Sequence, residues 1–188
     1  MVHQQVQAAI KNLNLASLEQ MSDDDLIAIA ESDELDSKTQ RTLVELAMLK
    51  YQAAIESGDE DNHNSYSMPE WVEILAGNTK LSTVNCRKLA TLQSERVIAA
   101  VARNPNTPTS ILRQFCSDSS KHFQFTIASI IDNPNCPRTL ALTIAMNETL
   151  LLQDDVIDAL LEYEGWTEAD LKRLARMGIE GFEEDESQ

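Results

Sequence analysis

Apolar residues recur along most of the chain at three- and four-residue intervals, which is the spacing of one face of an amphipathic helix. The pattern predicts a helix from Ser22 to about Ala30 and a longer one from Ser37 to about Ile55, each opened by a polar capping sequence. Helix is expected to resume near Pro69. Gly and Pro number only five each, so little interrupts these segments. The sequence therefore predicts an all-α protein.

Two copies of one proline-containing motif break the helical pattern. The first copy is Asn104, Pro105, Asn106, Thr107 and Pro108, and the second, 29 residues on, is Asn133, Pro134, Asn135, Cys136 and Pro137. An Asn before Pro disfavours the helical conformation, so the first proline of each copy marks a helix end. The second proline fits the first position of a new helix, where its missing N–H costs nothing. We interpret the motif as a joint between two helices, with capping side chains, in preference to a ligand contact.

Weaker copies of this joint flank the two clear ones. Aligning Leu81, Thr107, Cys136 and Trp166 gives successive steps of 26, 29 and 30 residues. Each step accommodates one helix–turn–helix unit, and units of this length stack into an α-solenoid. We expect about four such repeats, with the degenerate outer copies acting as caps that face water.

The predicted organisation has four parts. Residues 1–57 form an N-terminal helical extension, residues 58–67 an acidic linker, residues 68–177 the repeat domain and residues 178–188 an acidic tail. The linker loosely imitates a calcium-binding loop that starts at Asp59. However, His63 and Asn64 stand where such a loop needs an oxygen ligand and a glycine, so we interpret the segment as a solvated linker.

The segment from Val97 to Phe115, repeated from Ala128 to Ile144, resembles the leucine-rich repeat variant family at both Asn-Pro joints. Proteins of that family stack short helical repeats into a right-handed superhelix, and the resemblance implies that architecture and a binding role here. The repeats of this chain are longer, so both elements should be full α-helices, as in HEAT and armadillo arrays. The family's founding architecture also carries a cysteine cluster for an iron–sulfur centre. Cys86, Cys116 and Cys136 are too widely spaced for such a cluster, so no cofactor is expected.

Charge is distributed unevenly along the chain. The net charge is −16, made up of −9 over residues 1–68, +3 over residues 69–146 and −10 over residues 147–188. This excess of acid disfavours non-specific binding to nucleic acid and to anionic membranes, because both require Lys and Arg. The sequence has no apolar run of membrane-spanning length, no signal-peptide pattern and an odd number of cysteines. We therefore expect a cytoplasmic protein with reduced thiols.

The basic residues of the middle region recur in register. In the alignment above, Arg87, Arg113 and Lys172 occupy one position of the second helix of their repeats. Four further cations follow one residue later or lie on first helices, namely Lys88, Arg173, Arg96 and Arg103. Stacked repeats would bring these side chains into a cationic column suited to an acidic peptide, a carboxylate surface or a phosphate backbone. An ordinary solvated face would account for the same residues.

No residue pattern points to catalysis. The sequence lacks a Gly-rich phosphate loop, a nucleophile elbow and paired zinc ligands, and Cys116 is interpreted as a small apolar residue at a helix end rather than a nucleophile. We expect a non-enzymatic protein–protein interaction scaffold, without metal or cofactor, that holds an acidic or amphipathic partner segment in its groove. The alternative is an acidic mimic that occupies the basic site of a nucleic-acid-binding protein. Nucleic-acid contact through the column is disfavoured by the overall charge.

Overall fold

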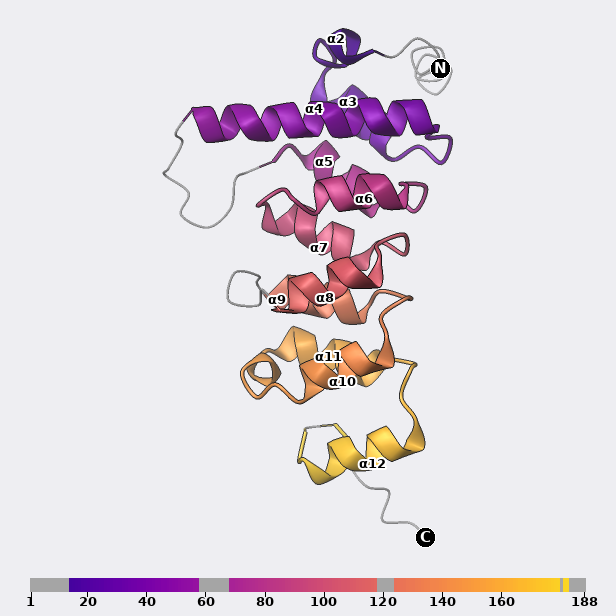
Figure 1. The fold of residues 1–188 in the computed structure, drawn as a ribbon, viewed down its shortest axis with the longest axis vertical. Helices are drawn as coiled ribbons and strands as arrows, with labels where there is room; N and C mark the ends of the chain where they lie inside the picture. Colours follow the sequence, from indigo (N-terminus) through magenta and orange to yellow (C-terminus); the bar gives the residue numbers. More distant parts are fainter. Residues whose placement is uncertain (1–13, 58–67, 118–123, 180, 183–188) are drawn as a thin grey trace. The chain divides into compact units, whose positions relative to one another are not determined.

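The computed structural model describes residues 14–57, 68–117, 124–179 and 181–182, and all regular structure in these ranges is helical (Figure 1). The elements are α2 (Leu15–Leu18), α3 (Asp23–Ala30), α4 (Ser37–Glu56), α5 (Glu70–Gly77), α6 (Thr83–Leu89), α7 (Glu95–Arg103), α8 (Thr109–Ser117), α9 (Gln124–Ile131), α10 (Arg138–Ala145), the 3-10 turn η1 (Leu150–Leu152), α11 (Asp154–Glu162) and α12 (Glu168–Arg176). They belong to two compact units, Met1–Pro108 and Thr109–Gln188. The prediction of an all-α protein is confirmed for the described ranges. The predicted linker and the end of the acidic tail lie outside them.

Short polar side chains start the helices of the first unit. Ser22 accepts a backbone N–H of the first turn of α3, as predicted. Asp36 caps α4, because its Oδ1 accepts the backbone N–H of Thr39 at 2.7 Å, and this bond is the main reason that the pKa of Asp36 lies below its usual value. The sequence analysis predicted that Ser37 opens this helix as its cap, and that position is wrong by one residue. Ser37 is the first helical residue, and Gln40 turns into the interior instead of back to the cap.

The first unit has a row of short helices and a long helix beside it. Helices α3, α5 and α7 pack successively on one another, while α4 packs against α2 and α6 (Figure 1). The core between them is aliphatic, with Leu43 of α4, Leu75 of α5, Leu89 of α6 and Val101 of α7 all fully buried. Trp71, in the first turn of α5, is also fully buried. Each such side chain contributes about 1.5–3 kcal/mol through its removal from water.

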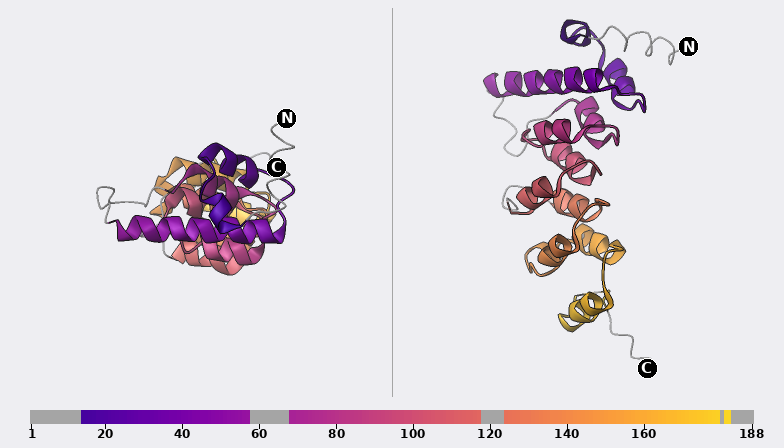
Figure 2. Two further views of the ribbon diagram at one scale, coloured as in Figure 1. Left: turned by 90° about the horizontal axis from the view of Figure 1, so that it is seen from above. Right: turned by 45° about the vertical axis from the view of Figure 1, so that its right-hand side comes forward.

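Helix α4 runs well past its neighbour α6, as Figure 2 shows from two further directions. All of its buried residues lie between Thr39 and Ala47, and beyond them Leu49 and Ile55 are 48% and 40% exposed. Packing therefore fixes α4 through its N-terminal turns. None of the helices in the described ranges combines the length and the apolar character that crossing a bilayer requires.

The second unit is centred on α9, which packs against both α8 and α11, while η1 packs against α10 and α11. Side-chain contacts attach α12 to this group. Arg138, the first residue of α10, donates to Asp170 Oδ2 at 3.0 Å and to Thr167 Oγ1 at 3.2 Å. The ring of Trp166 meets that of Phe182 edge-on, with centroids 6.3 Å apart. The start of α12 is thus tied to the start of α10.

The Asp170→Asn variant tests this attachment. Hydrogen bonds from Thr167, and next the charge of Arg138, hold the pKa of Asp170 below its usual value. A carboxyl group with a lowered pKa adds stability that is present above its unfolded-state pKa and is lost as the pH falls through its folded-state pKa. Between about pH 7 and about pH 3 the native protein should therefore lose more stability than the variant in urea unfolding. Equal losses would show that the carboxylate adds nothing.

Candidate functional site

The joint after α7 is held by the side chain of Asn104, which is 1% exposed. Its backbone is extended, with φ −67° and ψ 126°, and the helix ends at Arg103, as predicted. The Asn104 Nδ2 donates to the carbonyl oxygens of Ala76 at 2.7 Å and Asn78 at 2.9 Å, at the C-terminal end of α5. Its Oδ1 accepts the backbone N–H of Asn106 at 2.9 Å. The amide thus supplies donors to helix-end carbonyls that the helix itself leaves without them.

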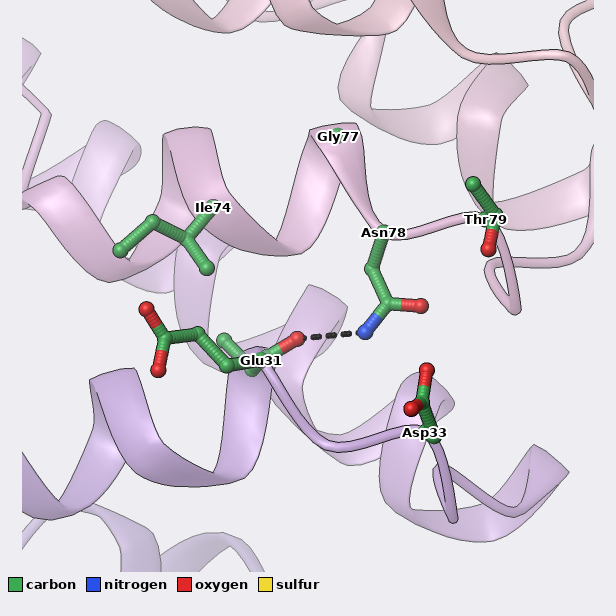
Figure 3. Close-up of a pocket in the computed structure, with 7 residues that line it drawn as sticks. Glu31, Asp33, Ile74, Gly77, Asn78 and Thr79 are labelled. Carbon is green, nitrogen blue, oxygen red and sulfur yellow. Dashed lines mark hydrogen bonds between the residues drawn. The ribbon is translucent and has the colours of Figure 1, made fainter.

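Asn78 makes the same bonds one joint earlier. Its backbone angles are φ −66° and ψ 120°, and its Nδ2 donates to the carbonyl oxygens of Ala30 at 2.7 Å and Ser32 at 3.1 Å. Its Oδ1 accepts the N–H of Lys80, two residues on, at 2.8 Å. Figure 3 shows the amide of Asn78 directed at the end of α3. Equivalent asparagines therefore link the C-terminal ends of the successive helices α3, α5 and α7, which pack side by side.

A shallow hollow of about 220 Å³ lies beside Asn78 (Figure 3). Its lining residues are Ala30, Glu31, Asp33, Ile74, Gly77, Asn78 and Thr79. Its one amide group, on Asn78, is already bonded to α3, and its carboxylates, on Glu31 and Asp33, belong to exposed residues. We assign the hollow to the joint between helices.

The Asn-Pro joint of the second unit has the same local turn. Asn133 is buried, and its Oδ1 accepts the N–H of Asn135 at 2.8 Å. The N–H of Cys136 donates to the Asn133 carbonyl at 2.7 Å, as the N–H of Thr107 donates to the Asn104 carbonyl at 2.9 Å. The two copies of the sequence motif thus fold into the same turn.

The second proline of each motif precedes the helix instead of opening it, so the predicted position is wrong by one residue. Pro137 caps α10 with φ −70° and ψ 137°, and the first helical residue is Arg138. Helix α8 likewise begins at Thr109, after Pro108. The extended backbone keeps Pro137 outside the helix, while its carbonyl already accepts the N–H of Ala141 at 3.1 Å.

The joint before α12 uses aromatic residues. Trp166 Nε1 donates to a backbone carbonyl six residues earlier, and the Thr107 hydroxyl does the same in its own joint. Tyr163 follows α11 with φ −67° and ψ 112°, close to the angles of Asn104. Its hydroxyl donates to the Cys136 carbonyl at 2.9 Å. Larger side chains therefore make backbone contacts of the kind that Thr and Asn make elsewhere.

The predicted partner-binding cations are all exposed, and they fall in both units. In the first unit, Arg96 Nε lies 3.0 Å from Glu73 Oε2, an ion pair between α7 and α5. Arg103 ends α7. Among the described residues, no hydrogen bond or ion pair engages the side chains of Arg87 and Lys88 on α6. These two are the predicted cations of the first unit that are available to a partner.

In the second unit the predicted cations contact neighbouring side chains. The contacts are those of Arg113 with Thr139 Oγ1 at 3.1 Å, Lys172 with Glu168 Oε1 at 2.6 Å and Arg173 with Met146 Sδ at 3.3 Å. All three cations remain exposed, so such contacts hold them weakly. Sequence reasoning missed Arg138, whose structural bonds to the start of α12 are described above.

Gln40 joins the start of α4 to the start of α6. Its Nε2 donates to the carbonyl oxygens of Leu35 at 3.0 Å and Lys80 at 2.8 Å. Its Oε1 accepts the N–H of Ser82 at 3.0 Å and Nδ2 of Asn85 at 3.3 Å. Sequence reasoning missed this connection, because the partners are 40 to 45 residues away along the chain.

Gln40 is flanked by two exposed cations, Lys38 and Arg41. The sequence analysis did not place these two residues at a binding surface. Val84, at the start of α6, is 65% exposed. The sequence signal near Lys38 and Arg41 was the polar capping sequence at the start of their helix, which was assigned to a local role.

The thiols are neutral at physiological pH. Burial raises the pKa of Cys86 and Cys116, and it raises the pKa of Cys136 to about 11. Because a thiolate is the reactive form, these groups are poor nucleophiles. Within the described ranges no three His, Cys, Asp or Glu side chains are grouped as metal ligands. The calcium-like loop of the linker lies outside those ranges.

Comparisons of the chain with protein-family models, curated proteins and solved structures find no match. The resemblance to the leucine-rich repeat variant family therefore stays a prediction, and the arrangement of side chains carries the functional argument.

Replacing Asn104 by Ala should destabilise the first unit by about 2–4 kcal/mol, because the Ala76 and Asn78 carbonyls lose their donor where water has little access. Asn106→Ala is the matched control. The side chain of Asn106 makes one exposed bond, from its Nδ2 to the Thr79 carbonyl, so the loss of this bond should cost about 0.5–1 kcal/mol. Urea unfolding measures both, and similar costs would contradict the role of Asn104.

The Asn104→Asp variant keeps the size and shape of the side chain but removes its N–H donors. The carboxylate keeps the acceptor but turns an oxygen towards two carbonyl oxygens, so it should destabilise the protein more than Ala does at neutral pH. The introduced carboxyl would have a raised pKa, so its destabilising effect should lessen as the pH falls through that pKa. Unfolding curves of the two variants at neutral and acidic pH test this.

Proposed function

We propose that this protein is a non-enzymatic scaffold that binds a partner protein through an acidic or amphipathic segment of that partner. The observation that carries the proposal is the exposure of cations on α6, α8 and α12 in a chain whose net charge is −16. An acidic partner is attracted to these side chains and repelled by most of the remaining surface. Such a distribution directs an acidic partner to the cationic helices of each unit.

The architecture proposed for this scaffold is a right-handed α-solenoid of about four repeats, of the HEAT, armadillo and leucine-rich repeat variant kind. Two observations support it. Asn78 and Asn104 make equivalent bonds at the ends of α5 and α7, and Asn133 follows Asn104 at the spacing of one helical pair. Helical pairs that bury their apolar faces against their neighbours leave an elongated surface free for binding.

The polar side chains of the joints are occupied in bonds between helices, which leaves recognition to the exposed helix surfaces. The exposed cations proposed to take part are Arg87, Lys88, Arg113, Lys172 and Arg173. Arg96 is a weaker candidate, because Glu73 already neutralises it. Each of these side chains is exposed, so a partner reaches them without rearrangement of the core.

Arg113→Glu should abolish capture of the partner with little change in thermal stability. Arg113 is exposed, and its bond to Thr139 is a surface contact worth about 0–1 kcal/mol. Affinity capture on the full chain, with chemical cross-linking and mass spectrometry, measures the partner, and a thermal melt measures the fold. Capture that survives the charge reversal would remove Arg113 from the site.

Thr139→Ala is the control, because it removes the hydrogen bond but keeps the charge of Arg113. Capture should persist in this variant. Loss in both variants would mean that the bond, not the charge, matters. If the native chain and Arg113→Glu capture nucleic-acid-binding proteins equally well, the acidic-mimic hypothesis is favoured instead. For that role α3 offers the exposed acids Asp23, Asp24 and Asp25.

A further inference from the structure

The first turns of α4 and α6 form one continuous surface. Gln40 of α4 bonds Ser82 N, at the cap of α6, and Asn85 Nδ2, in its first turn, so the two helices begin side by side and run in the same direction (Figure 1). Because Gln40 and Asn85 point at each other, they mark the sides on which the two helices meet. Other residues can be placed around each helix from these two.

Helical geometry puts Arg41, Val84 and Lys88 on the same exposed side of that contact. Arg41 follows Gln40 by one residue and is turned by about 100° from it, while Val84 precedes Asn85 by one residue and is turned by about 100° in the opposite sense. In parallel helices that face each other, these opposite turns lead to the same side. Lys88, three residues after Asn85, lies about 60° round on that side too.

Lys38 and Arg87 are also exposed, but they lie further round their helices, each about 160° from the contact. We call these five residues, Lys38, Arg41, Val84, Arg87 and Lys88, the α4–α6 surface. Within the described ranges no hydrogen bond or ion pair engages the side chains of Arg41, Arg87 or Lys88. Two exposed acids lie at its edge, Glu45 one turn beyond Arg41 and Asp36, whose pKa is lowered by the Thr39 bond and, less strongly, by the charge of Lys38.

Val84 gives this surface an apolar centre. At 65% exposed it has the largest exposed fraction among the large hydrophobic side chains of the described residues. Arg41 and Lys88 beside an aliphatic side chain, with Lys38 and Arg87 further round the two helices, complement a peptide that carries an apolar residue among carboxylates. A phosphate backbone would use the cations but not Val84, and it would meet repulsion from the acidic remainder of the chain.

We infer that the α4–α6 surface binds an acidic peptide segment with an apolar side chain that packs on Val84. The inference rests on the proposed function and deepens it, because it adds Lys38 and Arg41, which lie outside the predicted repeat domain. A variant of Arg41 tests this inference separately from the proposed function, because the cationic column does not include Arg41.

A synthetic peptide of repeating Glu-Glu-Leu-Glu, labelled with a fluorophore, is the probe, and its affinity for the full chain is read by anisotropy. Arg41→Glu should weaken binding at least about tenfold, because it turns an attraction into a repulsion on the Val84 side of the helix contact. Val84→Ser should weaken it by about three- to tenfold through the lost apolar contact. Neither residue contributes to the core, so the melting temperature should hold.

Lys50→Glu is the matched control for Arg41→Glu. Both positions are exposed cations of α4, and the nine-residue separation puts them on opposite sides of the helix, at about 180°. The control makes the same change in net charge and should alter affinity by less than about twofold. A peptide with Ser in place of Leu should bind the native chain more weakly than the Leu peptide does. The Ser peptide should bind Val84→Ser as tightly as it binds the native chain.

The inference is overturned if the probe fails to bind, if Arg41→Glu and Lys50→Glu have equal effects, or if oligothymidylate binds more tightly than the peptide. The proposed function is judged separately by partner capture. A partner lost with Arg113→Glu but retained with Arg41→Glu and Val84→Ser would leave the scaffold standing and move its site to the second unit.

Discussion

The fold depends on supplying donors to carbonyl oxygens at the ends of stacked helices. When short helices such as α3, α5 and α7 pack in a row, their C-terminal carbonyls are drawn away from water, and each must find a donor elsewhere. Asn suits this position because its amide offers two N–H donors to the preceding helix and one oxygen to its own turn. Asp lacks the donors. At 104 and at 78 the amide uses all of these groups, which couples the end of each helix to the position of the one before it.

This coupling divides the polar residues into two classes. Gln40 and Asn104 are buried and Asn78 is half-buried, and all three are bonded to backbone atoms from distant parts of the sequence. The cations on α6, α8 and α12 are exposed, and the contacts that they make are weak surface contacts. The buried class carries the stability of the stacking and would be costly to alter, whereas the exposed class is free to vary with the partner. A binding function is therefore sought among exposed side chains, even though the joint residues are the more distinctive feature of the sequence.

Much of the fold follows from the sequence, because helix periodicity and proline act locally. The all-α class, the span of α4 and the helix end before Asn104 are of this kind. The caps at Ser37 and Pro137 were misplaced by one residue because neighbouring residues compete for the same N–H or carbonyl, and tertiary packing decides between them. The roles of Gln40 and Asn104 depend on carbonyls 26 to 40 residues away, which no local pattern reveals. The ion pair of Arg96 with Glu73 was hidden for the same reason.

Charge and packing act together on the α4–α6 surface. The large negative net charge creates a field that opposes the approach of any acidic segment, and this field extends about 8–10 Å at physiological salt. An acidic partner therefore gains only where cations outweigh the field locally and where an apolar contact, which salt does not screen, adds to them. Gln40 creates that condition by bringing cations from two helices around Val84. The buried hydrogen bonds of the Gln40 side chain, which hold α4 against α6, thereby assemble an exposed surface. Its residues come from segments that are far apart in the sequence.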